Sequence, residues 1–162
     1  MFFQELKDLK LAVNRLKTDL VPSLQTEISA LQSNSAILLE LETSEGVLSK
    51  TAMQLNQDAN AMYRMLKFVL IPLIEELIQN PEQNQSIQSF DILRIYHKRI
   101  HAHFNDLRVL CNQHIVEMTW SFQKKVSCLN VYHSEQVFLK YVNFMETTLF
   151  SLLKPYIKVQ AL

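Results

Sequence analysis

A stripe of polar and basic side chains is the most extensive chemical pattern in this 162-residue chain. Its members follow one another at alternating steps of four and three residues, a spacing that places them on one face of a helix. They are Arg94, Lys98, His101, Asn105, Arg108 and Asn112. A phosphate backbone could lie along this face, with Arg94, Lys98 and Arg108 as the contacts to nucleic acid. The alternative interpretation is the solvent-exposed face of a bundle helix.

Six residues separate Arg94 from His101 within this stripe. This spacing resembles the Arg-x(4–6)-His motif of the HEPN family of all-helical ribonucleases, in which dimerisation brings the two residues into a cleft. The resemblance implies that Arg94 stabilises an RNA phosphate and that His101 is a general acid or base. A metal-independent ribonuclease is therefore the alternative to the binding function considered below.

Two pairs of side chains have spacings that suit a metal ion. His97 and His101 lie four residues apart and share a helix face, but the cations Lys98 and Arg99 between them disfavour a divalent ion. His114 and Glu117 lie three residues apart and could serve a metal-binding helical bundle. The simpler interpretation is that His114 lies at the edge of the core. No cofactor is expected.

The two cysteines, Cys111 and Cys128, lie seventeen positions apart in a stretch that reads mostly as one helix. At about 1.5 Å per residue they are expected roughly 25 Å apart, which is beyond the reach of a disulfide. This favours the cytoplasm or another reducing compartment. The longest wholly apolar run, residues 68–74, is much shorter than the roughly twenty residues that a membrane span needs.

The composition excludes several classes of site. The chain has one glycine, Gly46, where roughly eleven are expected, so glycine-rich phosphate loops, dinucleotide fingerprints and tight hairpins are not expected. The 16 basic and 16 acidic residues balance, but residues 1–90 hold 7 basic and 11 acidic side chains and residues 91–162 hold 9 and 5. Either oppositely charged helices attract one another within a bundle, or the second half offers a basic surface to an anionic partner.

Apolar residues recur with helical periodicity along most of the chain. This predicts an all-α fold in a single domain of residues 1–162, an elongated antiparallel bundle of four to five helices with coiled-coil-like seams. The helices are expected over residues 2–21, 23–43, 47–79, 89–126 and 134–154. Pro22 and Pro72 either kink or break their helices, Gly46 marks the sharpest turn, and no internal repeat is visible at a fixed period.

The first helix carries a narrow apolar seam that is suited to a partner helix. We interpret it as a partner-binding surface, together with two terminal aromatic residues and one tryptophan that falls off the main apolar stripe. These residues are Phe2, Phe3, Leu6, Leu9, Val13, Leu16 and Trp120. The leading hypothesis is therefore a non-enzymatic helical module for protein–protein interaction or assembly, either self-associating or part of a complex.

Overall fold

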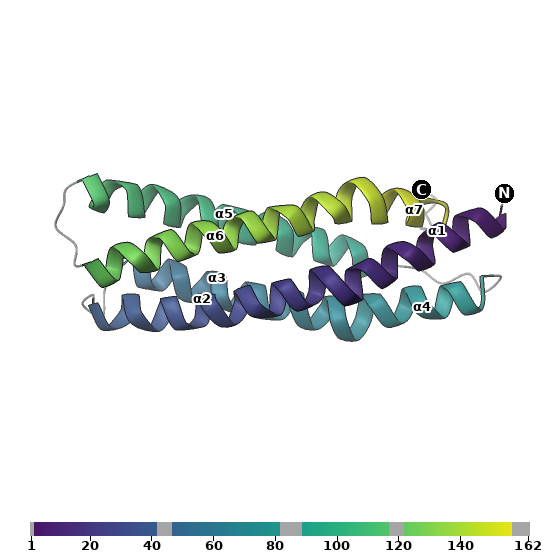
Figure 1. Ribbon diagram of the computed structural model, residues 1–162, viewed down its shortest axis with the longest axis horizontal. Coiled ribbons are helices and arrows are strands. Elements are labelled where there is room, and N and C mark those ends of the chain that lie inside the picture. Colours follow the sequence, from purple (N-terminus) through teal and green to yellow (C-terminus); the bar gives the residue numbers. More distant parts are fainter. Residues whose placement is uncertain (1, 42–46, 82–88, 117–121, 157–162) are drawn as a thin grey trace.

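The computed structural model describes residues 2–41, 47–81, 89–116 and 122–156, which form four long helical rods (Figure 1). We call them the first to the fourth rod in chain order. The first rod comprises α1 (Phe2–Arg15), η1 (Leu16–Leu20) and α2 (Val21–Leu41), and the second comprises α3 (Val47–Met65), η2 (Leu66–Leu70) and α4 (Ile71–Gln79). The third rod is α5 (Ser89–Val116), and the fourth comprises α6 (Phe122–Phe144), η3 (Met145–Leu149), α7 (Phe150–Leu153) and η4 (Lys154–Tyr156).

The rods run antiparallel to their neighbours and form an elongated four-helix bundle, which confirms the predicted fold class (Figure 1). Helix α2 packs against α3 and α6, α3 packs against α5, and α5 packs against α6. At the other end α1 packs against α4 and α7, so the first and fourth rods are also neighbours. No helix of the described ranges is both long enough and apolar enough to cross a membrane.

The apolar seams predicted from the sequence lie mostly in the interior of the bundle, whereas Val69 of the second seam is 43% exposed. The first rod contributes Leu9, Val13, Leu16, Leu20, Leu24, Ile28 and Leu31, and the second contributes Ala52, Leu55, Ala59, Met62 and Leu66. Leu9, Leu16, Leu55 and Leu66 have no solvent-exposed surface. Burial of these side chains is the main favourable contribution to the stability of such a fold.

Each neighbouring pair of rods is also joined by a polar contact. In chain order these contacts are Lys17 to Glu75, Asp58 to Arg99, Arg94 to Glu146 and Ser134 to Glu27, at distances of 3.4, 3.1, 3.1 and 2.7 Å. One of the four, Asp58 to Arg99, is an ion pair between the acidic first half of the chain and the basic second half. The charge difference between the halves is therefore used in part within the bundle.

Both central prolines lie inside continuous helical rods, immediately after a turn of π-helix. The N–H of Val21 bonds to the carbonyl of Leu16, and the N–H of Ile71 bonds to that of Leu66, so each turn is one residue wider than an α-helical turn. A proline ring clashes with the carbonyl four residues earlier, and a wide turn before Pro22 or Pro72 relieves this crowding. Of the two alternatives left open at Pro22, a kink or a break, the structure shows no break, because the helical rod continues through a π-bulge.

The two bulges lie in segments of similar sequence that periodicity did not reveal. Leu16-Lys17 and Leu20-Val21-Pro22 correspond to Leu66-Lys67 and Leu70-Ile71-Pro72, fifty positions later. Their surroundings correspond too, because both segments bury the first leucine and the pair before the proline and expose the three residues between. The third π-helical turn, η3, has no proline after it at the matching position.

The boundaries in the second half of the chain differ from the predicted ones. Helix α5 ends at Val116 and α6 begins at Phe122, whereas the predicted helices ended at 126 and began at 134. Residues 127–133, which lay between the two predicted helices, include cap-forming and β-branched types such as Asn130 and Val131, yet they lie inside α6, where Cys128 and Val131 are buried in the core. Tertiary packing thus overrides local propensity in this segment. The turn assigned to Gly46 lies outside the described residues.

Candidate functional site

The two arginines of the basic stripe are engaged within the bundle. Arg94 Nε lies 3.1 Å from Glu146 Oε1, and its guanidinium lies 4.6 Å from the ring centroid of Phe150. Arg108 Nη1 lies 3.5 Å from Oε1 of the buried Glu135. A phosphate would have to compete with these carboxylates for both arginines.

The other members of the stripe divide into two groups. Asn105 accepts a hydrogen bond from Arg108 at 2.8 Å, and Asn112 accepts one from the Tyr132 hydroxyl at 2.6 Å. Lys98 and His101 are exposed on α5 and enter no hydrogen bond or ion pair with the described residues. The proposed RNA-cleaving pair is thus split between Arg94, which is ion-paired within the bundle, and His101, which faces solvent.

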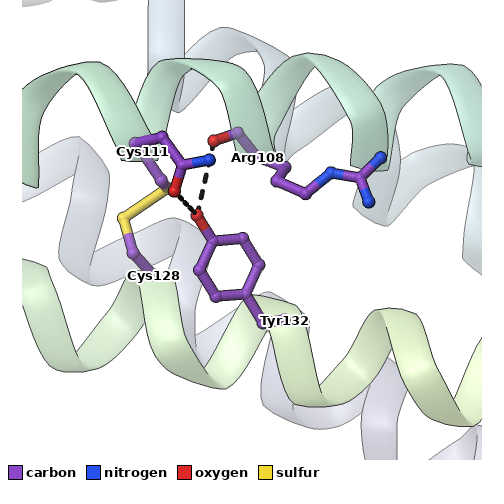
Figure 2. The surroundings of a disulfide bond; sticks show 5 residues. Arg108, Cys111, Cys128 and Tyr132 are labelled. Carbon is purple, nitrogen blue, oxygen red and sulfur yellow. Dashed lines mark hydrogen bonds between the residues drawn. A yellow bond between two sulfur atoms is a disulfide. The ribbon is translucent and has the colours of Figure 1, made fainter.

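Cys111 and Cys128 form a disulfide between α5 and α6, so the predicted separation of roughly 25 Å is wrong (Figure 2). The chain reverses between the two helices, and this brings the Cα atoms to 6.0 Å. The Tyr132 hydroxyl beside the bond also lies 3.3 Å from the backbone carbonyl of Arg108. Both cysteines are fully buried, and the argument for a reducing compartment no longer holds.

His97 and Tyr141 form a buried hydrogen-bonded pair between α5 and α6. Their Nε2 and hydroxyl atoms lie 2.9 Å apart, and the Phe138 ring packs edge-on against His97. Burial, with a smaller contribution from Arg94, lowers the pKa of His97 from 6.5 to about 4. Burial, with a smaller contribution from Glu146, raises the pKa of Tyr141. Both side chains are therefore neutral at pH 7, and His97 is turned inward while His101 is exposed.

No group of three or more potential metal ligands occurs within the described ranges. The proposed His97 and His101 pair divides between the core and the solvent, so the two imidazoles do not converge on one ion. The His114 side chain and Glu117 lie outside the described part of the chain.

A polar cluster between α3 and α5 was not predicted from the sequence. Asp58 is almost fully buried and forms an ion pair with Arg99, with 3.1 Å between Oδ1 and Nη2. Its other oxygen, Oδ2, lies 2.8 Å from His103 Nε2. Gln54 and Gln57 line the same surface pocket of about 380 Å³. The sequence feature that could have revealed this cluster is the position of the acidic Asp58 between the seam residues Leu55 and Ala59. Arg99 and His103 on α5 both contact Asp58 on α3, so the cluster orients α5 against α3.

The predicted partner-binding seam lies largely inside the protein. Leu9, Val13 and Leu16 are buried against the chain's own helices, and Leu6 is half-buried. A partner cannot reach the three buried residues in this fold, because the second and fourth rods occupy the position that a partner helix would take. Trp120 and the side chains of Phe2 and Phe3 lie outside the described part of the chain.

A different apolar surface is exposed across η2 and α5. It consists of Phe68, Val69, Ile92 and Ile95, which are 65, 43, 43 and 58% exposed, and we call these four residues the apolar patch. The antiparallel pairing of Asp58 with Arg99 and His103 places η2 beside the first turns of α5, and these two elements are in contact. Sequence analysis missed the patch because it spans two rods whose register only the fold reveals.

No protein-family model, no curated protein and no solved structure matches this chain. The chemistry of the described residues therefore carries the functional argument alone. The side chains capable of proton transfer are tied into pairs that hold the rods together, or stand singly on the surface. Leu11, Met53, Val109 and Leu129 are exposed as well, and the apolar patch gathers the other four exposed large apolar side chains of the described residues on two elements that are in contact.

Proposed function

We propose that this chain is a helical protein-binding module and that the apolar patch is its binding surface. The observation that supports the proposal is the exposure of four large apolar side chains on two adjoining elements. Single exposed apolar residues are ordinary on soluble proteins, whereas exposed apolar residues gathered on adjoining elements are typical of an interaction site. Aromatic and aliphatic side chains of this kind serve as the anchors of protein interfaces.

The first rod offers an internal comparison for the patch. Its bulge has the same pattern of burial as η2, and the positions equivalent to Phe68 and Val69 are occupied by Thr18 and Asp19. The π-bulge therefore accepts polar residues at its exposed positions. The apolar pair in η2 is not a requirement of the local fold, which supports a role in binding.

The test is the native mass of the full chain and of its complexes after a gentle purification from the cells that produce it. We expect wild-type protein to elute with a stoichiometric protein partner and the double variant Phe68→Asp/Ile95→Asp to elute without it, because two buried carboxylates would oppose the interface. The matched control is Leu129→Asp, since Leu129 on the fourth rod is 59% exposed, close to the 58% of Ile95.

Circular dichroism of each variant establishes that the helical bundle is retained. Retention of the partner by the folded double variant would contradict the proposal. Equal loss of the partner with Leu129→Asp would also contradict it, because the effect would then not be specific to the patch.

The disulfide supports a second inference about where the module acts. A buried bond between Cys111 and Cys128 is typical of compartments in which disulfides persist. We expect protein trapped by acid and alkylated under denaturing conditions without reductant to show no free thiol by mass spectrometry. Two alkylated cysteines in the freshly trapped protein would contradict this inference.

A further inference from the structure

We infer that the segment bound at the apolar patch is an acidic amphipathic helix of another protein. This inference rests on the proposed function and specifies the chemistry of its partner. It is carried by the basic side chains that border the patch and by the helical elements that form it.

Basic side chains border the patch on both rods. Arg64 precedes Phe68 by four residues on an exposed face of the second rod, and Lys67 Nζ lies 5.6 Å from the centroid of the Phe68 ring. On α5 the exposed Lys98 and Arg99 follow Ile95 by three and four residues, which places them one turn away on the same side of the helix. We call Arg64, Lys67, Lys98 and Arg99 the basic rim.

Of the four cations in the basic rim, Arg99 is paired within the chain. Asp58 is almost fully buried and is shared between Arg99 and His103. Asp91, one turn before Ile95, is the exposed carboxylate on this part of α5. Arg64, Lys67 and Lys98 form no ion pair with the described residues, so three unpaired cations border the patch, and a partner with carboxylates beside its apolar residues is electrostatically complementary.

The shape of the surface favours a helix. The described residues contain no strand, so no sheet edge is offered here to an extended peptide. Two antiparallel helices instead present apolar side chains on both sides of their line of contact, and a third helix can pack there with anchors at i, i+3, i+4 and i+7. The lower exposure of Val69 and Ile92, compared with Phe68 and Ile95, agrees with positions nearer to that line.

The basic rim disfavours a second copy of the chain as the occupant. In a twofold-symmetric dimer each patch would face its own equivalent, so the four cations of one copy would lie against those of the other. Juxtaposed like charges oppose association, whereas a glutamate-flanked helix gains from the same charges.

The experiment uses the full chain and two synthetic peptides of about 18 residues, or about 27 Å of helix. Both peptides carry leucines at a and d spacing. One has glutamates beside the leucines, and the other has lysines at the same positions. We expect the glutamate peptide to bind about tenfold more tightly by fluorescence anisotropy, and the preference to weaken as salt is raised from about 0.05 to 0.5 M.

The decisive variant is Arg64→Glu/Lys98→Glu, which we expect to reverse the preference between the two peptides. Its matched control, Lys10→Glu/Lys140→Glu, makes the same change in net charge at exposed positions away from the patch. Phe68→Asp/Ile95→Asp should abolish binding of both peptides. Equal binding of the two peptides, no binding of either, or an unchanged preference in the rim variant would overturn the inference.

Two further measurements separate the possible failures. If Phe68→Asp/Ile95→Asp loses the native partner but Arg64→Glu/Lys98→Glu keeps it, then the proposed function stands and the inference of an acidic helix is wrong. If neither variant loses a partner, the proposed function itself fails. A single-stranded oligonucleotide that binds through Phe68 and Ile95 more tightly than the glutamate peptide would assign the surface to nucleic acid and overturn the inference.

Discussion

At the scale of single residues, polar groups in the interior fix the helices relative to one another. His97 is 5% exposed and shares a hydrogen bond with Tyr141, while its Nδ1 has no hydrogen-bond partner among the described residues. Asp58 satisfies two donors from α5 at once. Buried polar contacts of this kind add less to stability than apolar burial does, but they penalise any register in which they are broken.

The lowered pKa of His97 predicts a pH-dependent stability. Its pKa is 6.5 in the unfolded chain and about 4 in the folded protein, so the unfolded chain binds more protons between these values. The contribution of neutral His97 to the free energy of unfolding is fully present above pH 6.5, and it is lost progressively as the pH drops toward 4. From pH 7 to pH 5 we expect a loss on the order of 2 kcal/mol in the free energy of unfolding.

Urea unfolding at pH 7 and pH 5 checks this prediction, with His97→Gln as the comparison. Glutamine can still form a hydrogen bond with Tyr141 but does not titrate. The other ionisable groups are common to both proteins, so the difference in pH dependence belongs to His97. Identical losses in the two proteins would show that His97 does not control this pH range.

At the scale of the elements, the π-bulges explain how proline-containing rods remain continuous. Without one of the residues inside η1, Leu16, Leu20, Val21 and Leu24 would stand at i, i+3, i+4 and i+7, which is the pattern of an ordinary helix face. The bulge is therefore a one-residue insertion in a regular seam. It preserves the inward direction of the apolar residues on both sides of the turn.

Deletion of Thr18 tests the relation between the bulge and Pro22. The apolar face should keep its direction, but the proline ring would now meet the carbonyl of Lys17 in an α-helical turn, at a cost of about 3 kcal/mol. In the Pro22→Ala background the same deletion should cost little, so the double variant should be nearly as stable as Pro22→Ala alone. Urea unfolding of the four proteins measures both effects, and a deletion that is harmless with Pro22 present would refute the explanation.

The sequence predicts some helices more accurately than others. The predicted seam of the second rod runs from Leu48 to Leu73, and its members from Ala52 to Leu66 are buried. Beyond them η2 shifts the register by one residue, so Val69 is 43% exposed and Leu70 and Ile71 are buried instead.

The predicted boundary between α5 and α6 is wrong. Ser127, Asn130 and Ser134 are residue types that often cap helices, but here they lie inside α6, where the neighbouring Cys128 and Val131 are buried. Local signals do not contain the tertiary packing that decides between these outcomes.

At the scale of the whole molecule, the candidate site illustrates a similar limit. Arg94 and His101 were visible as a pattern within one helix, whereas the partner of Arg94, Glu146, is 52 positions away along the chain. The apolar patch likewise joins Phe68 with Ile95 from different rods. Spacing predicts which side chains share a helix face, but it does not predict which side chains a neighbouring rod will cover.

The contact between the first and fourth rods has a consequence for the order of folding. The other neighbouring rods follow each other directly in the sequence, so few residues separate the segments that pair. The pairing of α1 with α7 instead joins segments from the two ends of the described chain. Long-range closure carries the larger entropic cost and is slower. We therefore expect two helical hairpins to form early and their docking along this last seam to limit the folding rate.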